Sequence, residues 1–291
     1  MYNLYNLSIK KNIILLIILF LSIQGCSTLS VQTTMVEINS GQIAVSVKGN
    51  ESPTVVFESG LGVNKETWSD VFNEVVKTNK VFAYDRAGLG ESPSSSASRD
   101  SCTIAKELHE SLIASNTKPP YVLVGHSIGG LYQYVFAKLY PDEVAGLVLV
   151  DSYFPEPWKY KAQLPLPKEY LLLNDNKKPN YLIRLQNRLE EKYTTGGRES
   201  TKRDVCLENI DITKPVTFPV RMITAIKDEN VPGISLAWLK KRDRSRQEEW
   251  FHTLGKRVPV REIDSSHYIQ EDRPDIVIEE ILKLINEVKR K

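Results

Sequence analysis

The chain has 291 residues, of which 41% are hydrophobic and 25% are charged, which suits one globular α/β domain with an elaboration, or at most two domains. Gly and Pro usage is ordinary and no internal repeat is visible, which excludes solenoid and low-complexity architectures. The net charge of +2 comes from Lys10 and Lys11 alone, because the chain after residue 25 has equal numbers of acidic and basic side chains. No basic field for nucleic acid is implied, and no nucleic-acid partner is expected.

Residues 1–25 are predicted to be an export signal. Two lysines precede an apolar run at 13–21 that is too short for a comfortable membrane span. The run leads to Gly25-Cys26, which resembles the cleavage site of bacterial lipoproteins. That resemblance implies a lipid on Cys26, a tether at 26–34, and a membrane-anchored protein that faces the periplasm or the cell exterior. An uncleaved anchor helix and an ordinary signal peptide are the alternatives, and both also export the protein.

Strands and helices alternate after the tether. A hairpin is expected over residues 35–47, and the strands that follow are apolar throughout instead of alternating. This pattern predicts an α/β fold with a mostly parallel, doubly wound sheet covered by helices on both faces, and the hairpin adds an antiparallel edge. The remaining expected elements are strands at 54–57, 81–84, 121–124, 144–150, 219–225 and 258–263, and helices at 67–76, 103–115, 131–139, 236–254 and 275–288.

The alternation stops at residues 152–215. This segment holds six prolines, several aromatic side chains and a charged helical stretch near 181–193, but no apolar run of strand length. The composition predicts a mostly helical cap insertion at 152–215, within a core made of residues 35–151 and 216–291.

A GxSxG motif, Gly125-x-Ser127-x-Gly129, connects a predicted buried strand to a predicted helix. A strand that turns directly into a helix bends sharply, and the two glycines let neighbouring backbone approach without Cβ clashes. The hydroxyl of Ser127 is therefore expected to project above the sheet edge. The N–H of Ile128 points into the same space at a helix N-terminus, which favours negative charge. A tight glycine-rich turn without chemistry is the alternative interpretation.

A nucleophilic serine needs a neighbouring base, which a third group orients. Of the four histidines, His267 is the candidate, because it follows the last strand at the carboxyl edge of the sheet, where open α/β folds place their ligands. His109 and His252 lie within predicted helices. The side chain of His126, next to the serine, is expected to point away from the hydroxyl.

Two aspartates compete for the orienting role. Asp228 follows the strand at 219–225, Asp151 follows the strand before it, and both reach the same sheet edge. Asp228 is preferred, because the order Ser127, Asp228, His267 is the one expected for a serine on this kind of turn. Asp151, the alternative acid, is then expected to hydrogen-bond to the start of the insertion.

From about Thr54 to the C-terminus, the chain resembles the α/β-hydrolase family in its serine-nucleophile branch. The landmarks that carry the resemblance are Ser59-Gly60-Leu61-Gly62, residues 85–92, the turn at Ser127, residues 225–228 and Ser266-His267. The resemblance implies an oxyanion hole made by the backbone N–H groups of Leu61 and Ile128. Ser59 stands where the family frequently has a histidine. Serine instead of aspartate at the turn argues against the family's haloalkane dehalogenase and epoxide hydrolase branches.

These features predict a serine hydrolase that cleaves carboxylic esters, or related acyl bonds, of a small-molecule acyl substrate through an acyl-enzyme. No metal cluster or nucleotide loop is evident in the sequence, so neither a metal nor a cofactor is expected. Aminopeptidase, thioesterase, lactonase and carbon–carbon bond hydrolase activities use the same triad and stay open. A ligand-binding or receptor-like lipoprotein on the same fold is the alternative from another class.

Two cysteines, Cys102 and Cys206, lie in the part of the chain that follows the lipoprotein signal. In an exported protein they either pair, which would close a long loop, or remain two separate buried thiols. The sequence leaves both alternatives open.

Overall fold

The computed structural model describes residues 32–152, 194–202, 206–207, 210–211, 214–226 and 235–290. The chain divides into two units, Met1–Gln32 and Thr33–Lys291, and the described fold is that of the second unit. The predicted signal segment and Cys26 lie outside the described residues, as does most of the predicted insertion. No helix in the described part of the chain has the length and apolarity needed to cross a membrane.

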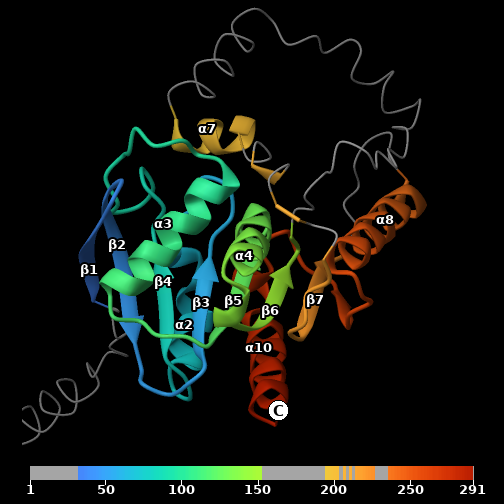
Figure 1. The fold of residues 1–291 in the computed structure, drawn as a ribbon. Helices are drawn as coiled ribbons and strands as arrows, with labels where there is room; N and C mark the ends of the chain where they lie inside the picture. The colour runs from blue at the N-terminus through green and yellow to red at the C-terminus, as the bar shows by residue number, and fades with distance from the viewer. Residues whose placement is uncertain are drawn as a thin grey trace, which may run out of the picture. The chain divides into compact units, whose positions relative to one another are not determined.

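The described residues form an eight-stranded sheet with the strand order β1-β2-β4-β3-β5-β6-β7-β8 (Figure 1). β1 pairs with β2 and β2 with β4 in antiparallel register, whereas the other neighbours pair in parallel. The α/β fold class and the antiparallel leading hairpin are thus confirmed. The strands are β1 (Thr33–Ile38), β2 (Gly41–Lys48), β3 (Thr54–Glu58), β4 (Val81–Tyr84), β5 (Tyr121–His126), β6 (Val144–Val150), β7 (Val220–Ala225) and β8 (Val260–Ile263).

Helices cover both faces of the sheet. In Figure 1, α3 (Ser101–Ala114) and α4 (Ile128–Leu139) lie in front of it, while α2 (Ser69–Val75) and α10 (Pro274–Lys289) lie behind. α7 (Thr195–Lys202), which belongs to the predicted insertion, lies above the carboxyl ends of the central strands. The other described helices are η1 (Lys65–Trp68), η2 (Pro141–Glu143), α8 (Leu236–Leu254) and α9 (Ile269–Asp272).

The central strands are buried along their whole length, which explains their continuous apolar sequences. Every residue of β3, β4 and β5 is buried, as expected for parallel strands covered on both faces. From the front layer, Leu131 and Val135 of α4 pack against this sheet with no exposed surface. From the back layer, α10 contributes the buried side chains of Val277, Ile281 and Leu284.

Several element boundaries differ from the sequence-based expectation by one to three residues: β5 ends at His126, α4 begins at Ile128 and β8 begins at Val260. Two of the differences have a clear local cause. α3 begins two residues early, because the carboxylate of Asp100 accepts hydrogen bonds from the N–H groups of Cys102 and Thr103, both at 3.0 Å. β1 begins inside the predicted tether, because Thr33 already pairs with Ser46 of β2. A side-chain cap in the first case, and pairing with the neighbouring strand in the second, extends the element beyond its apolar pattern.

Cys102 and Cys206 form a disulfide across 104 residues of sequence, with their Cα atoms 5.8 Å apart. The bond resolves the alternative that the sequence left open, in favour of pairing. It ties α3 to the chain that follows α7. In the chain-entropy model, closing a loop of about 100 residues stabilises a protein by about 4 to 5 kcal/mol.

Candidate active site

Ser127 occupies a strained turn between β5 and α4. Its backbone has φ 52° and ψ −124°, in the left-handed region that residues other than glycine rarely adopt. The strain is held in place by neighbouring backbone. The N–H of Ser127 donates to the carbonyl oxygen of Val150 at 3.0 Å, and a Cβ on Gly125 would lie 2.5 Å from the carbonyl oxygen of Gly129. The glycine spacing therefore reflects close backbone approach, as the motif predicted.

The start of α4 also packs directly on the end of β3. A Cβ on Gly129 would lie 2.5 Å from the carbonyl oxygen of Glu58 and 2.7 Å from that of Ser59. A Cβ on Gly60 would come within 3.5 Å of the Cβ of Ser127. The loop of residues 59–62, called the oxyanion loop below, is thus adjacent to the serine.

The two backbone groups expected to bind an oxyanion come from these neighbouring segments. Ile128 is the first residue of α4, so its N–H has no partner within the helix. Leu61 lies at the exposed tip of the oxyanion loop. Hydrogen-bond donors at a helix N-terminus and in an adjacent loop suit the stabilisation of developing negative charge.

His267 is hydrogen-bonded to Asp151. The distance from His267 Nδ1 to Asp151 Oδ2 is 2.6 Å, the aspartate is buried and the imidazole is exposed. Asp151 follows β6 with φ 41°, and its Oδ1 accepts from the N–H of Ala225 at 3.3 Å. With Nδ1–H donated to the carboxylate, Nε2 of the neutral imidazole carries the free electron pair that a general base needs.

Asp151 thus makes the hydrogen bond that the sequence analysis assigned to Asp228. Asp228 lies outside the described residues, and the preference for it stays a prediction. Among the described residues, the carboxylate of Asp151 is hydrogen-bonded to the ring of His267 and the backbone N–H of Ala225. The physical reason is that β6 and β8 flank β7, so the residue after β6 can reach the loop after β8. A bond from Asp151 to the start of the insertion lies outside the described residues and stays a prediction.

His126 fixes the backbone of the loop that carries His267, a role that the sequence analysis missed. Its Nε2–H donates to the carbonyl oxygen of His267 at 2.8 Å, and the two rings lie 4.6 Å apart. Burial, together with the neighbouring His267, lowers the pKa of His126 to about 4. The side chain is therefore neutral near pH 7. The available signal was that His126 is the only imidazole in the buried strand β5.

One cluster of potential metal ligands is present in the part of the chain that the structure describes. It consists of Asp100, Cys102 and Cys206. Its two cysteines are joined as a disulfide, which removes both thiolates as ligands.

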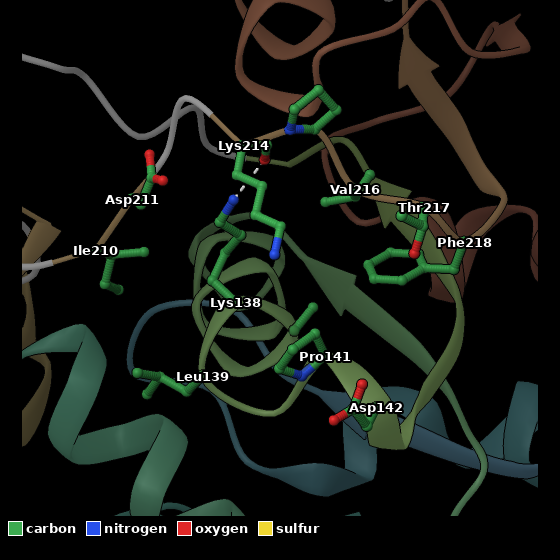
Figure 2. A pocket seen from close by; sticks show the side chains of 12 residues that line it. Lys138, Leu139, Pro141, Asp142, Ile210, Asp211, Lys214, Val216, Thr217 and Phe218 are labelled. Carbon is green, nitrogen blue, oxygen red and sulfur yellow. Dashed lines mark hydrogen bonds between the residues drawn. The ribbon is translucent and has the colours of Figure 1, made fainter.

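Two cavities bear on where a substrate binds. One of about 820 Å³ adjoins the oxyanion loop at Gly62 and is also lined by Leu89, Ser95 and Arg198. A second, of about 360 Å³, lies at the C-terminal end of α4, where Lys138 donates to the carbonyl oxygen of Lys214 at 2.6 Å (Figure 2). Since α4 rises by about 1.5 Å per residue, its far end is well removed from Ser127. The cavity beside Gly62 is thus the better placed for chemistry at the serine.

A family model described as the alpha/beta hydrolase family matches residues 55–280. The chain belongs to the alpha/beta hydrolase family. The match covers most of the sheet, the turn at Ser127 and the loop that carries His267.

Individual relatives share shorter stretches with this alpha/beta hydrolase. YqjL of Bacillus subtilis strain 168 is 38% identical over 104 residues, which is 36% of this chain and 41% of that protein. RutD of Escherichia coli O1:K1 / APEC, whose name proposes a carbamate hydrolase, is 35% identical over 104 residues, which is 35% of this chain and 39% of that protein. The chain thus aligns with about two-fifths of the length of each.

Solved structures extend the likeness of fold to nearly the whole alpha/beta hydrolase. Cfl2 from Burkholderia cenocepacia superposes with a TM-score of 0.65 at 16% identity, covering 87% of this chain and 95% of that one. At this identity the likeness concerns the fold alone.

Proposed function

We propose that this alpha/beta hydrolase is a serine hydrolase that cleaves carboxylic esters, or related acyl bonds, of small or medium-sized substrates. Ser127 is the nucleophile, His267 the general base and acid, and Asp151 the residue that orients the imidazole. The observation that carries the proposal is the 2.6 Å hydrogen bond between Asp151 and His267, at the sheet edge where Ser127 occupies its strained turn.

The first half-reaction transfers the acyl group to the serine. Ser127 Oγ attacks the carbonyl carbon while His267 Nε2 takes the hydroxyl proton, and Asp151 stabilises the imidazolium that forms. The N–H groups of Leu61 and Ile128 receive the oxyanion of the tetrahedral intermediate. The intermediate collapses when His267 gives its proton to the leaving alcohol, which leaves the acyl group on Ser127.

The second half-reaction releases the acid. His267 now takes a proton from water, whose oxygen attacks the acyl carbon, and the same two N–H groups receive the second oxyanion. The collapse returns the proton to Ser127 Oγ. Aminopeptidase, thioesterase, lactonase and carbon–carbon bond hydrolase activities would use the same triad on other acyl bonds. RutD adds carbamates to the substrates worth testing.

Hydrolysis of p-nitrophenyl esters of increasing acyl length tests the proposal. We expect the purified protein to release p-nitrophenol with saturation kinetics and a preference for one range of chain length. A protein that binds these esters without turning them over would instead be the receptor-like lipoprotein. The same assay with a p-nitrophenyl carbamate, an anilide and a thioester ranks the alternative acyl bonds.

We further propose that the enzyme is exported and held at a membrane by a lipid on Cys26. Two features support this placement: the short apolar run that leads to Gly25-Cys26, and the disulfide between Cys102 and Cys206, a bond typical of oxidising compartments. One acyl chain gives only marginal membrane binding, so stable anchoring requires the several chains of a lipoprotein.

Replacing Cys26 with serine should leave esterase activity intact and move the enzyme out of the membrane fraction, or leave its precursor unprocessed. The reason is that the thiol is the attachment point of the lipid, while the catalytic domain lies in another part of the chain. Labelled palmitate should enter the unmodified protein and not the Cys26→Ser protein. Equal palmitate incorporation into both proteins would rule out the lipid on Cys26.

A further inference from the structure

A buried ionic cluster lies directly behind the oxyanion loop. Arg86 follows β4, Glu58 ends β3, and Glu199 comes from α7, and each side chain is at most 1% exposed. Nε and Nη2 of Arg86 donate to the two carboxylate oxygens of Glu199 at 2.8 and 2.9 Å, and Nη1 donates to Glu58 at 2.7 Å. A bidentate pair of this kind fixes the orientation of the guanidinium plane as well as its position.

The remaining two hydrogen bonds of Arg86 hold the oxyanion loop. Nη1 donates to the carbonyl oxygen of Ser59 and Nη2 to that of Gly60, both at 2.8 Å. All five N–H bonds of the guanidinium are thereby used, which is its full donor capacity. The arginine cannot rotate without breaking a contact to the loop or to a carboxylate.

The bond to Gly60 helps to fix where the Leu61 N–H points, together with a longer bond of 3.2 Å from the N–H of Val63 to the same carbonyl oxygen. The carbonyl group of Gly60 and the N–H of Leu61 belong to the same planar, trans peptide unit, so they point in opposite directions. A guanidinium that holds the oxygen from behind therefore aims the N–H at the opposite side. A charged donor on the carbonyl oxygen also polarises the peptide and strengthens its N–H as a hydrogen-bond donor.

α7 reaches the same loop by direct packing. A Cβ on Gly196 would lie 3.4 Å from the Cα of Gly62, and one on Gly88 would collide with Thr195 Oγ1. Figure 1 shows α7 above the strand ends from which Glu58 and Arg86 extend. Glu199 of α7 thus connects the insertion to the core at the point where the oxyanion loop begins.

We propose that Glu199 is a positioning residue for the oxyanion hole. Through Arg86 it fixes the Gly60–Leu61 peptide, so acyl transfer at Ser127 depends on the docking of α7. The inference rests on the proposed serine hydrolase function, because it assigns a role within that oxyanion hole. The insertion then covers the sheet edge and also contributes, through Glu199, to the geometry of the oxyanion hole.

The inference predicts an effect on kcat with little effect on KM. A backbone donor that meets the substrate oxygen only as it becomes an oxyanion stabilises the transition state more than the ground state. Loss of one such donor costs about 10²- to 10³-fold in kcat. A donor that is present but points in the wrong direction should lower kcat by a smaller factor. If the ion pair were purely structural, its loss would lower the melting temperature without lowering kcat selectively over KM.

The test compares Glu199→Gln with Glu107→Gln. Glu107 is the matched control, because its carboxylate pairs with the buried Arg99 at 2.7 Å and accepts from Ser40, while neither contact reaches the oxyanion loop. Arg99 Nη2 also lies 4.0 Å from Glu199 Oε1, so Glu107→Gln perturbs the same ionic cluster but leaves both bonds from Arg86 to Glu199 in place. Both variants remove a buried carboxylate from a buried arginine. Each is assayed on a p-nitrophenyl ester well below its own melting temperature, and each is titrated with a trifluoromethyl ketone, which forms a tetrahedral oxyanion with the serine.

For Glu199→Gln we expect kcat to fall by about 10- to 100-fold with KM changed less than about threefold. The affinity for the ketone should fall by a similar factor. Glu107→Gln should keep kcat and ketone affinity within about threefold of the unmodified enzyme. Equal kcat and ketone affinity in Glu199→Gln and Glu107→Gln would overturn the inference.

Two further outcomes are a Glu199→Gln variant that does not fold and an unmodified enzyme without esterase activity. If Glu199→Gln does not fold, Glu199→Asp replaces it: the shorter carboxylate keeps the charge but loses the bidentate reach. A lower kcat at unchanged KM then supports the inference, and an unchanged kcat overturns it. If the unmodified enzyme hydrolyses none of the esters, the proposed function fails, a result distinct from an active enzyme that is indifferent to Glu199.

Discussion

Replacing Ser127 with alanine is expected to lower kcat by about 10⁶-fold, as removal of a catalytic serine does in enzymes whose triad acts as a unit. The substitution removes the only atom that attacks the substrate. It removes no core volume, because Ser127 is half-buried and its side chain is small. The melting temperature should therefore stay within a few degrees of that of the unmodified enzyme.

The measurement is initial-rate hydrolysis of the best p-nitrophenyl ester, together with circular dichroism and thermal melting of each protein. Ser115→Ala, at the C-terminal end of α3, is the control for an ordinary loss of a hydroxyl. It should retain full activity. Substantial turnover by a folded Ser127→Ala protein would remove Ser127 from the mechanism and leave the family assignment intact.

The second large effect is expected for Asp151→Asn. An asparagine at this position can donate its amide to Nδ1 of His267, which selects the tautomer whose Nε2 carries the proton and cannot act as a base. Such a change of acid to amide lowers kcat by about 10⁴-fold with little change in geometry. Asp228→Asn, measured in parallel, should cost far less, because Asp151 already pairs with His267 at 2.6 Å.

The pH dependence of kcat/KM in the two variants completes this test. For Asp151→Asn, kcat/KM should be low at every pH measured. For Asp228→Asn, kcat/KM should depend on pH in the same way as it does in the unmodified protein. The reversed pattern, with Asp228→Asn inactive and Asp151→Asn active, would identify Asp228 as the acid of the triad, as the chain order predicted.

The fold was predictable from the sequence because its elements carry strong apolar patterns. β6 and α8 have the bounds that the sequence analysis expected, Val144–Val150 and Leu236–Leu254. The turn at Ser127 was predictable for a different reason, since only glycine at positions 125 and 129 permits the observed backbone approach. Boundaries that depend on one capping or pairing contact, such as the start of α3, leave no trace in the apolar pattern.

The acid of the candidate site illustrates what the sequence does not contain. Asp151 and Asp228 each follow a strand whose end reaches the same edge, so their spacing in the chain does not decide which one meets His267. The decision depends on a three-dimensional distance and on the left-handed backbone of Asp151. The pairing of Cys102 with Cys206 depended likewise on a Cα separation, here 5.8 Å.

The contact between Arg86 and Glu199 was also beyond the sequence. The two residues are 113 positions apart, and the charged stretches of the insertion carry no apolar period that would place one carboxylate over β4. The landmark at residues 85–92 marked Arg86 only as part of a family pattern. The structure adds its five hydrogen bonds and hence the link to the oxyanion loop.

The central claim is that Ser127 is an activated nucleophile, and covalent labelling with a fluorophosphonate tests it most directly. The probe phosphonylates a serine only where a base removes the hydroxyl proton and an oxyanion hole receives the developing charge. We predict one adduct, mapped by mass spectrometry to Ser127, that forms in parallel with the loss of esterase activity and is absent in Ser127→Ala and His267→Ala. An adduct on another residue, or esterase activity that survives full labelling of Ser127, would contradict the account.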